Sequence, residues 1–305
     1  MNKKIVITGA TGLIGKKLCK EFIGQGNELT IFTSNIVKAK ELIGGAKEYI
    51  YWDYNKPEEW KNNINGKDAV IHLAGAGIAG IRWSEEYKKK ILESREISTT
   101  NLVKAIKESN QKPGLLISAS AVGYYGNAGN EILTEESKNG RDFLADVCRI
   151  WEESAGRVEE AGVRRVSIRT GIALSSEGGA FKKMLLPFKM FIGGHLGSGK
   201  QWFPWIHIDD LIGIYIYALE NSSVRGIINA VSPNPVRAKE LAKIIGKTIH
   251  RPSMFPVPLF ALKLAVGEAA ESIVASQRVM PKKLLDSGFK FKFENIEKAL
   301  NDLMK

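Results

Sequence analysis

The 305-residue sequence predicts an α/β fold built on a doubly wound parallel sheet. Apolar runs of strand length alternate with amphipathic helical stretches, as expected when helices cover both faces of a parallel sheet. The first run leads into glycines at GxxGxxG spacing and then into a helical pattern. After residue 231, prolines separate two further helical patterns, which indicates a small, mostly helical C-terminal lobe.

The individual elements follow from this periodicity. Strands are expected at the runs rich in branched apolar residues, at 4–8, 28–33, 49–52, 69–73, 114–118 and 165–169, with a later strand at 226–229 closing the sheet. Helices are expected where apolar residues recur at helical spacing, most clearly at 12–23, 85–109 and 142–161, and later at 237–245 and 259–275.

The chain therefore divides into two predicted parts. Residues 1–231 form the larger domain, and the stretch at about 172–207, rich in glycine and aromatic residues, is interpreted as an insertion on its substrate side. Residues 232–305 form the small lobe. A cleft between the two parts is the expected place for a substrate.

The glycine-rich turn after the first strand is typical of a dinucleotide site in a Rossmann-type domain. Gly9 allows a tight turn, Gly12 lets the backbone approach a pyrophosphate, and Gly15 lets the helix pack closely on the strand. The helix amides then point at the anion. The other residues of the turn assigned to this site are Thr11, Leu13 and Ile14.

The end of the second strand favours NADP(H) over NAD(H). A carboxylate at this place binds the ribose 2′-hydroxyl of NAD, but here the residues are Thr33 and Ser34, followed by Lys38 and Lys40. Hydroxyl and ammonium groups can donate hydrogen bonds to a 2′-phosphate, which a carboxylate would repel. Asp53, just after the third strand, either accepts a hydrogen bond from the adenine or caps a turn.

Three further strand ends are expected to touch the cofactor. The turn Leu73-Ala74-Gly75 allows a close approach to the adenosine ribose and the pyrophosphate. Ser118 at the end of the fifth strand, and Thr170 and Gly171 after the sixth, should lie near the nicotinamide.

Four motifs follow one another along the chain: TGATGLIG at 8–15, HLAG at 72–75, SAS at 118–120 ahead of Tyr125-Gly126, and WIHIDD at 205–210. In this order they resemble the extended, epimerase-like branch of the short-chain dehydrogenase/reductase superfamily. Within that branch the chain resembles an atypical subgroup of epimerase-family, nucleoside-diphosphate-sugar epimerase-like proteins. The resemblance implies a Rossmann fold, NAD(P) binding and oxidoreductase or epimerase chemistry.

The residues at the usual catalytic positions differ from the pattern of that superfamily. Its usual Tyr-x-x-x-Lys pair, in which lysine lowers the tyrosine pKa, is replaced here by Leu144 and Cys148. Arg95 stands where an asparagine is common, and of the usual set only a serine remains, as Ser120 or alternatively Ser118. The standard mechanism therefore cannot simply be transferred.

Candidates for the missing proton transfer lie just beyond the fifth strand. Tyr124 or Tyr125 is expected to act as the donor, with Arg95 or Lys182 lowering its pKa; otherwise one ring packs in the core and the other lines the pocket. Arg95 is also a candidate clamp for a substrate carboxylate or phosphate, and Ser120 is the remaining hydroxyl candidate.

The histidines are interpreted structurally. Asp209 is expected to cap the helix that begins at the next residue, with His207 on the strand entering it. His72 is expected to be a hydrogen-bonded interior histidine. His195 and His250 have no partners at ligand spacing, so no metal site is expected.

Charge and cysteine usage limit the functional classes. The net charge of +11 comes from lysines spread along the chain, without a basic tail or an aromatic RNA-binding box, so no nucleic-acid partner is expected. Two distant cysteines suit a reducing compartment, and the longest apolar run, 211–219, is too short to span a bilayer. We expect a cytoplasmic protein without a membrane partner, as a monomer or homodimer.

The functional prediction combines these observations. The chain is expected to be an NADP(H)-binding oxidoreductase or epimerase-like protein with non-standard proton-transfer residues, acting on a small, polar, anionic substrate. The alternative, supported by Leu144 and Cys148, is a non-catalytic dinucleotide-binding sensor or scaffold protein.

Overall fold

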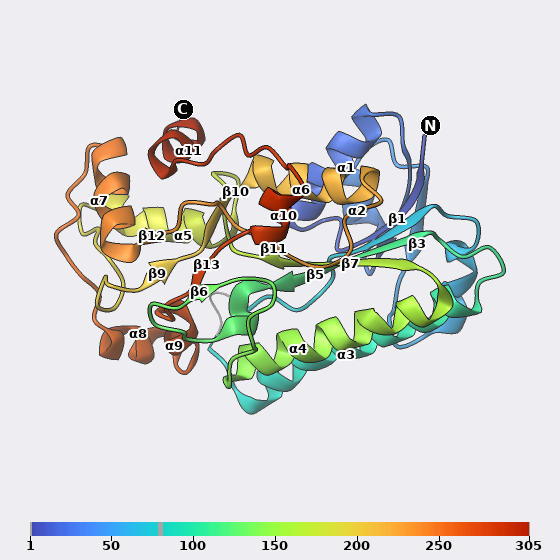
Figure 1. Ribbon diagram of the computed structural model, residues 1–305, viewed down its shortest axis with the longest axis horizontal. Helices are drawn as coiled ribbons and strands as arrows, with labels where there is room; N and C mark the ends of the chain where they lie inside the picture. Colours follow the sequence, from blue (N-terminus) through green and yellow to red (C-terminus); the bar gives the residue numbers. More distant parts are fainter. Residues whose placement is uncertain (1, 79–81, 305) are drawn as a thin grey trace.

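The computed structural model describes residues 2–78 and 82–304 and has a seven-stranded, fully parallel sheet at its centre (Figure 1). Its strand order is β3-β2-β1-β4-β5-β7-β11. The strands are β1 (Lys4–Thr8), β2 (Glu28–Thr33), β3 (Glu48–Tyr51), β4 (Ala69–His72), β5 (Leu115–Ala121), β7 (Arg164–Thr170) and β11 (Gly226–Ala230). The predicted doubly wound α/β fold is therefore confirmed, including the late strand that closes the sheet.

Helices cover both faces of this sheet (Figure 1). Ile5 and Ile7 of β1 pack in the same cluster as residues of α1 (Leu13–Gly24) and α6 (Ile208–Glu220). Val6 points to the opposite face, where it packs with α3 (Glu85–Glu108). The alternation along one strand thus places a helical layer on each side. The remaining elements of these layers are α2 (Ile36–Leu42), α4 (Phe143–Gly156) and the short 3-10 turns η1 (Pro57–Glu59), η2 (Lys61–Ile64) and η4 (Arg157–Ala161).

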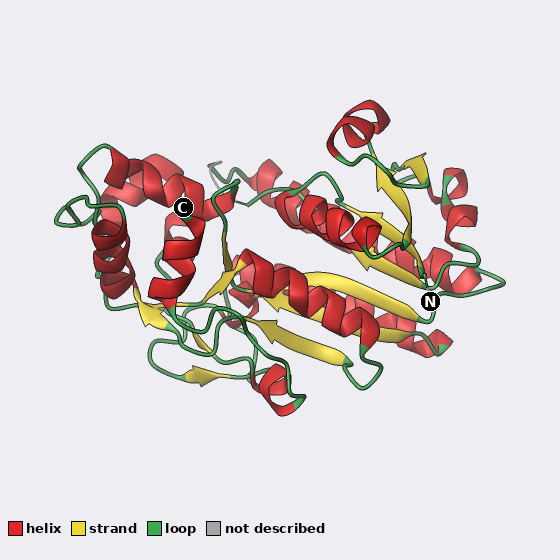
Figure 2. Ribbon diagram, turned by 90° about the horizontal axis from the view of Figure 1, so that it is seen from above, coloured by secondary structure: helices red, strands yellow, loops and turns green. Residues whose placement is uncertain are grey.

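The rest of the chain gathers at one end of the sheet (Figure 2). Three small two-stranded sheets pair β10 with β8, β12 with β9 and β13 with β6. Their strands are β6 (Ile132–Leu133), β8 (Ile172–Leu174), β9 (Trp202–Phe203), β10 (Trp205–His207), β12 (Val236–Arg237) and β13 (Arg278–Val279). The helical elements here are η3 (Val122–Tyr125), α5 (Gly179–Lys189), α7 (Ala238–Thr248), α8 (Leu259–Val266), α9 (Ala269–Ile273), α10 (Lys282–Asp286) and α11 (Ile296–Leu303).

A separate core joins the insertion to the C-terminal region. Phe181 of α5, Trp205 of β10, Leu241 of α7 and Leu300 of α11 are buried in one cluster. The predicted helical C-terminal region is confirmed, and it packs on the insertion rather than standing alone.

Two predicted elements differ in extent. The helix expected at 259–275 is broken at Gly267, whose φ of +65° lies in the left-handed region that favours glycine. The strand expected at 114–118 continues to Ala121 as β5. This extension matters for the site, because strand geometry then decides where the serines of 118–120 point.

Candidate functional site

A cavity of about 460 Å³ opens at the carboxyl ends of the central strands. Its lining runs from the glycine-rich turn after β1, past the ends of β5 and β7, to α4 and to residues 272–277 of the C-terminal region. The order of the strands reverses between β1 and β4, and ligands of open α/β sheets bind outside such a reversal.

The glycine-rich turn has the geometry that a dinucleotide needs. Gly9 has φ +69°, and a Cβ on it would lie 2.8 Å from the backbone nitrogen of Ala74. A Cβ on Gly15 would lie 2.4 Å from the carbonyl oxygen of Gly9, so the first turn of α1 sits directly against the turn. Gly12, by contrast, is the N-cap of α1, and a Cβ there would meet only Gly9 O, at 3.3 Å. The open side of Gly12 is the cavity, where the first amides of α1 are available to an anion.

The predicted cofactor residues fall into two groups. Those that line the cavity are Gly9, Gly12, Leu13, Ile14, Gly15, Leu73, Thr170 and Gly171. Those outside its lining are Thr11, Thr33, Ser34, Lys38, Asp53, Ala74, Gly75 and Ser118.

The second group includes the residues proposed for a 2′-phosphate. Ser34 and Lys38 are exposed beyond the carboxyl end of β2, and Thr33 Oγ1 accepts a hydrogen bond from Asn35 N at 3.1 Å. Asp53 Oδ1 accepts from Asn55 N at 3.0 Å, which is the turn-capping alternative of the two that the sequence left open.

Ser120 does not line the cavity. Its neighbours Ala119 and Ala121 line the cavity. The Ser120 hydroxyl instead donates to Glu152 Oε1 at 2.6 Å, within a buried layer of polar side chains from β5, β7 and α4. The sequence predicted a hydroxyl facing the pocket, and the structure places alanines there instead. The reason is the continuation of β5 to Ala121, which turns alternate side chains to opposite sides.

Tyr125 belongs to the same buried layer, and the half-buried Tyr124 lies beside it. The Tyr125 hydroxyl donates to Asn229 Oδ1 at 2.7 Å and accepts from Arg169 Nη1 at 2.9 Å. Tyr124 stacks on the Arg169 guanidinium, whose carbon lies 3.3 Å from the ring centroid. Neither tyrosine lines the cavity.

The pKa of Tyr125 also differs from the prediction. Burial raises it to about 12, against the weaker opposing charge and hydrogen bond of Arg169. The expectation that Arg95 or Lys182 lowers this pKa is therefore wrong: the nearby cation is Arg169, and desolvation outweighs it.

The ion pair between Arg169 and Glu152 holds this layer together. Two hydrogen bonds, Nε to Oε1 at 2.8 Å and Nη2 to Oε2 at 2.7 Å, join strand β7 to helix α4 with both side chains buried. A bidentate pair of this kind fixes both partners in orientation. Through Ser120 and Tyr125 it also fixes the end of β5 and the η3 turn, which form one wall of the cavity.

Arg95 is the predicted catalytic candidate that does line the cavity. It extends from α3 and donates to the carbonyl oxygens of Ile91 at 2.9 Å and Ala76 at 3.0 Å. Its guanidinium carbon lies 4.9 Å from the ring centroid of Trp151. Burial lowers its pKa, but a guanidinium stays charged at neutral pH.

Leu144 and Cys148, which the sequence predicts to occupy the positions of the Tyr-x-x-x-Lys pair, both line the cavity. Burial raises the pKa of the Cys148 thiol to about 12, which keeps it protonated at neutral pH. The lining formed by the described residues includes no tyrosine and no lysine.

Sequence reasoning missed several lining residues. Trp151 lies one helical turn after Cys148, so the spacing on α4 was an available signal. Ser272, Ala275 and Gln277 come from a segment far along the chain, and no local pattern places them at the cavity.

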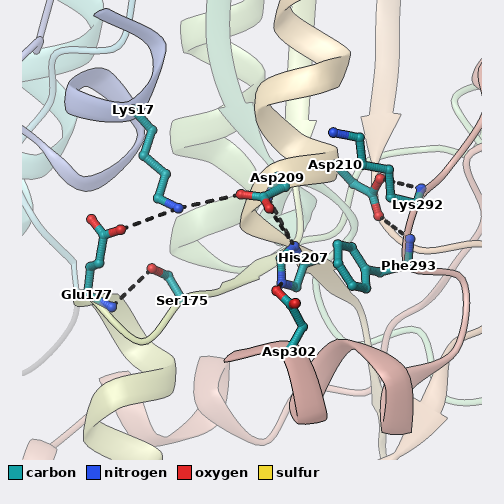
Figure 3. Close-up of polar contacts among 9 residues, drawn as sticks. All are labelled: Lys17, Ser175, Glu177, His207, Asp209, Asp210, Lys292, Phe293 and Asp302. Atoms are coloured by element: carbon teal, nitrogen blue, oxygen red, sulfur yellow. Dashed lines mark hydrogen bonds and ion pairs between the residues drawn. The ribbon is translucent and has the colours of Figure 1, made fainter. Parts of the chain in front are cut away.

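A second polar cluster lies at the junction of β10 and α6 (Figure 3). His207, not Asp209, is the N-cap of α6: its Nδ1 accepts from Asp209 N at 3.1 Å. The predicted cap is wrong because α6 begins at Ile208, two residues earlier than expected. Asp210 instead accepts hydrogen bonds from the backbone nitrogens of Lys292 and Phe293, at 2.7 and 2.9 Å.

His207, Asp209 and Asp302 offer ligand atoms that all lie within 4.8 Å of one another. Because Nδ1 already accepts the Asp209 amide, the proton of the neutral ring is on Nε2, which faces Asp302 Oδ2 at 3.5 Å. The Phe293 ring covers His207 with centroids 3.8 Å apart. These contacts account for the cluster as a link between α11 and α6, and the expected lack of a metal stays a prediction.

The predicted interior role of His72 is confirmed. The buried ring lies 2.7 Å from Thr8 Oγ1 through Nδ1, and 3.1 Å from Thr99 Oγ1 through Nε2. Burial lowers its pKa to about 3, and the charge of Arg95 adds to that shift.

Comparisons with known proteins agree with this architecture. The chloroplastic epimerase family protein SDR39U1 homolog of Arabidopsis thaliana is 41% identical over 303 residues, covering 99% of this chain and 86% of the relative. The epimerase family protein YfhF of Bacillus subtilis is 39% identical over 303 residues, covering 98% and 97%. The chain belongs to the epimerase family. The profile of the NAD dependent epimerase/dehydratase family matches residues 5–145, and a domain of unknown function (DUF1731) matches residues 257–303.

Among solved structures, the crystal structure of the human epimerase family protein SDR39U1 (isoform 2) with NADPH superposes with a TM-score of 0.88. The two chains are 31% identical, and the match covers 98% of each. These relatives confirm the predicted resemblance. Within the described residues, no helix is long and apolar enough to cross a membrane.

Proposed function

We propose that this protein is an NADP(H)-binding oxidoreductase or epimerase-type enzyme that acts on a small, polar, anionic substrate. The observation that carries the proposal is the continuity of one cavity, which runs from the glycine-rich turn to the partly buried cation Arg95. One end suits a pyrophosphate, and the other offers a charged group to a second molecule.

The residues present fit the cofactor. Gly12 and the first amides of α1 would hold the pyrophosphate, while Thr170 and Gly171 would lie near the nicotinamide end. Ser34 and Lys38 would hold a 2′-phosphate, and the human relative was crystallised with NADPH. When bound, the nicotinamide supplies or accepts a hydride.

Under this proposal, proton transfer does not use Tyr125 or Ser120. Tyr125 and Ser120 are committed to the Arg169–Glu152 layer and lie outside the cavity lining. We assign them to positioning the η3 turn. Arg95 would orient the anionic substrate by its charge and its planar donors.

A specific observation also favours the second candidate, a non-catalytic sensor or scaffold that binds the dinucleotide. The wall at Leu144 and Cys148 has no group with a pKa near neutrality. Under this alternative the cofactor binds and no substrate turns over.

The test is a titration of the purified protein with NADPH and with NADH, followed by nicotinamide fluorescence. The expected result is saturable NADPH binding with enhanced emission, at an affinity about tenfold higher than for NADH. Lys38→Ala should remove most of that preference. Lys40→Ala on the same helix should keep it, because the Lys40 ammonium lies over the Tyr49 ring, 5.8 Å from its centroid. A failure of both nucleotides to bind saturably would contradict both candidates.

A further inference from the structure

Arg95 carries a charge that the described residues leave without an acidic partner. No carboxylate of the described residues forms an ion pair with it, and its hydrogen bonds there go to the backbone carbonyls of Ile91 and Ala76. A partly buried cation is normally paired, because desolvation disfavours an isolated charge. Arg95 lines the cavity, so an oxyanion bound there would supply the missing partner.

Gln277 supplies a complementary group on another part of the wall. It is only 8% exposed, and its Nε2 donates to the carbonyl oxygens of Val122 at 3.0 Å and Gly126 at 2.9 Å. Both amide hydrogens are thereby used, which fixes the amide plane. Its Oε1 accepts no hydrogen bond from the described residues, and the side chain lines the cavity. An acceptor held in this way calls for a donor on the ligand.

The two groups come from different parts of the chain. Arg95 lies within the segment that matches the epimerase/dehydratase family, and Gln277 lies within the C-terminal domain of unknown function. Ser272 and Ala275 of the same C-terminal domain also line the cavity. This domain therefore contributes a wall of the site.

We propose that Arg95 and Gln277 recognise the substrate at two points: an oxyanion at Arg95, and a hydroxyl or amino hydrogen-bond donor at Gln277 Oε1. Ligands of this kind are small carboxylic acids or phosphates that also carry a hydroxyl or amino group. This inference rests on the proposed function. It assigns recognition of the substrate's hydrogen-bond donor to the C-terminal domain.

The experiment uses the full chain with saturating NADPH and small acids as probes at constant ionic strength. Glycolate carries both groups, acetate lacks the hydroxyl, methoxyacetate has it capped, and inorganic phosphate replaces the carboxylate. The readout is the change in NADPH emission and in the melting temperature as each probe is titrated to about 50 mM. NADPH affinity is measured first for every variant, so a failure of the proposed function is seen separately.

We expect glycolate to saturate, with acetate and methoxyacetate weaker by about tenfold, which corresponds to one hydrogen bond of about 1.4 kcal/mol. Arg95→Met should abolish the effect of all carboxylates, Arg95→Lys should retain part of it, and the surface control Arg149→Met should keep it. Gln277→Leu should bring glycolate to the level of acetate, whereas the exposed control Gln111→Leu should not. If phosphate alone saturates, the oxyanion is a phosphate.

Three results would overturn the inference. The first is that no probe saturates while NADPH binds. The second is that the Arg95 or Gln277 variants weaken NADPH itself, which would assign these residues to the cofactor. The third is that methoxyacetate binds as well as glycolate, which would show that the site does not recognise a hydrogen-bond donor on the ligand. The last result needs no substitution, so it stands even if Gln277→Leu disturbs the η3 turn.

Discussion

The nucleotide end of the cavity is built from backbone, whereas the substrate end is built from side chains. At the nucleotide end, Gly9, Gly12 and Gly15 shape the wall because they have no Cβ, and all three lie in one short segment of the chain. At the substrate end, Arg95 and Gln277 reach the cavity from segments far apart in the sequence. In the first kind of wall, Gly9 and Gly15 leave no room for a Cβ, whereas the second depends on the buried layer that orients its side chains.

The largest expected effect concerns the layer behind the substrate end. Arg169→Met leaves the Glu152 carboxylate buried without its partner, and we expect a loss of about 3–5 kcal/mol in the free energy of unfolding. Urea denaturation measures it. The double variant Arg169→Met/Glu152→Gln should recover part of the loss; a double variant no more stable than the single one would show that the ion pair does not set the cost.

At the nucleotide end, Gly15→Ala should destabilise by about 2–3 kcal/mol, because the new Cβ would fall 2.4 Å from Gly9 O. Gly24→Ala at the end of the same helix meets nothing within 4 Å and is the matched control, expected to be neutral or stabilising. Equal thermal stability of the two variants would contradict the close packing of α1 on the turn.

The third prediction concerns pH and His72, which joins the ends of β1 and β4. Its folded-state pKa of about 3 lies below the unfolded value of about 6.5, so the folded state resists protonation. Stability is therefore full above pH 6.5 and is lost as the pH falls, by about 2 kcal/mol from this group between pH 7 and 5. Urea midpoints of the parent and of His72→Asn should converge over that range; a constant difference would argue against the shift.

The smallest effect separates positioning from catalysis at Tyr125. Tyr125→Phe removes the hydroxyl between Arg169 and Asn229, and we expect a loss of about 1–2 kcal/mol with NADPH affinity unchanged. Thermal melts and the NADPH titration measure both quantities. If turnover is found, a loss of activity of a hundredfold or more at full cofactor affinity would return Tyr125 to a catalytic role.

The contrast between the two ends also explains what the sequence could predict. The strand order and the glycine-rich turn follow from local patterns, since apolar periodicity and glycine spacing act within a few residues. Ser120 could not be placed, because its direction depends on whether β5 ends at residue 118 or continues to Ala121. Gln277 could not be found at all, because only the fold brings it to the cavity.

The helix caps show the same limit on a smaller scale. Both His207 and Asp209 lie where a helix cap could fall in the sequence. Because α6 begins at Ile208, His207 is the N-cap. The pKa of Tyr125 likewise depends on its burial, which neighbouring residues in the sequence do not reveal.

The most direct test of the central claim, that the glycine turn and the cavity hold NADP(H), is an NADPH titration of Gly12→Val. The backbone of Gly12 has φ −73° and ψ 175°, which any residue adopts, and its open side is the cavity. The account predicts a melting temperature within a few degrees of the parent and a loss of NADPH affinity of a hundredfold or more. A stable Gly12→Val protein that binds NADPH as tightly as the parent would contradict it.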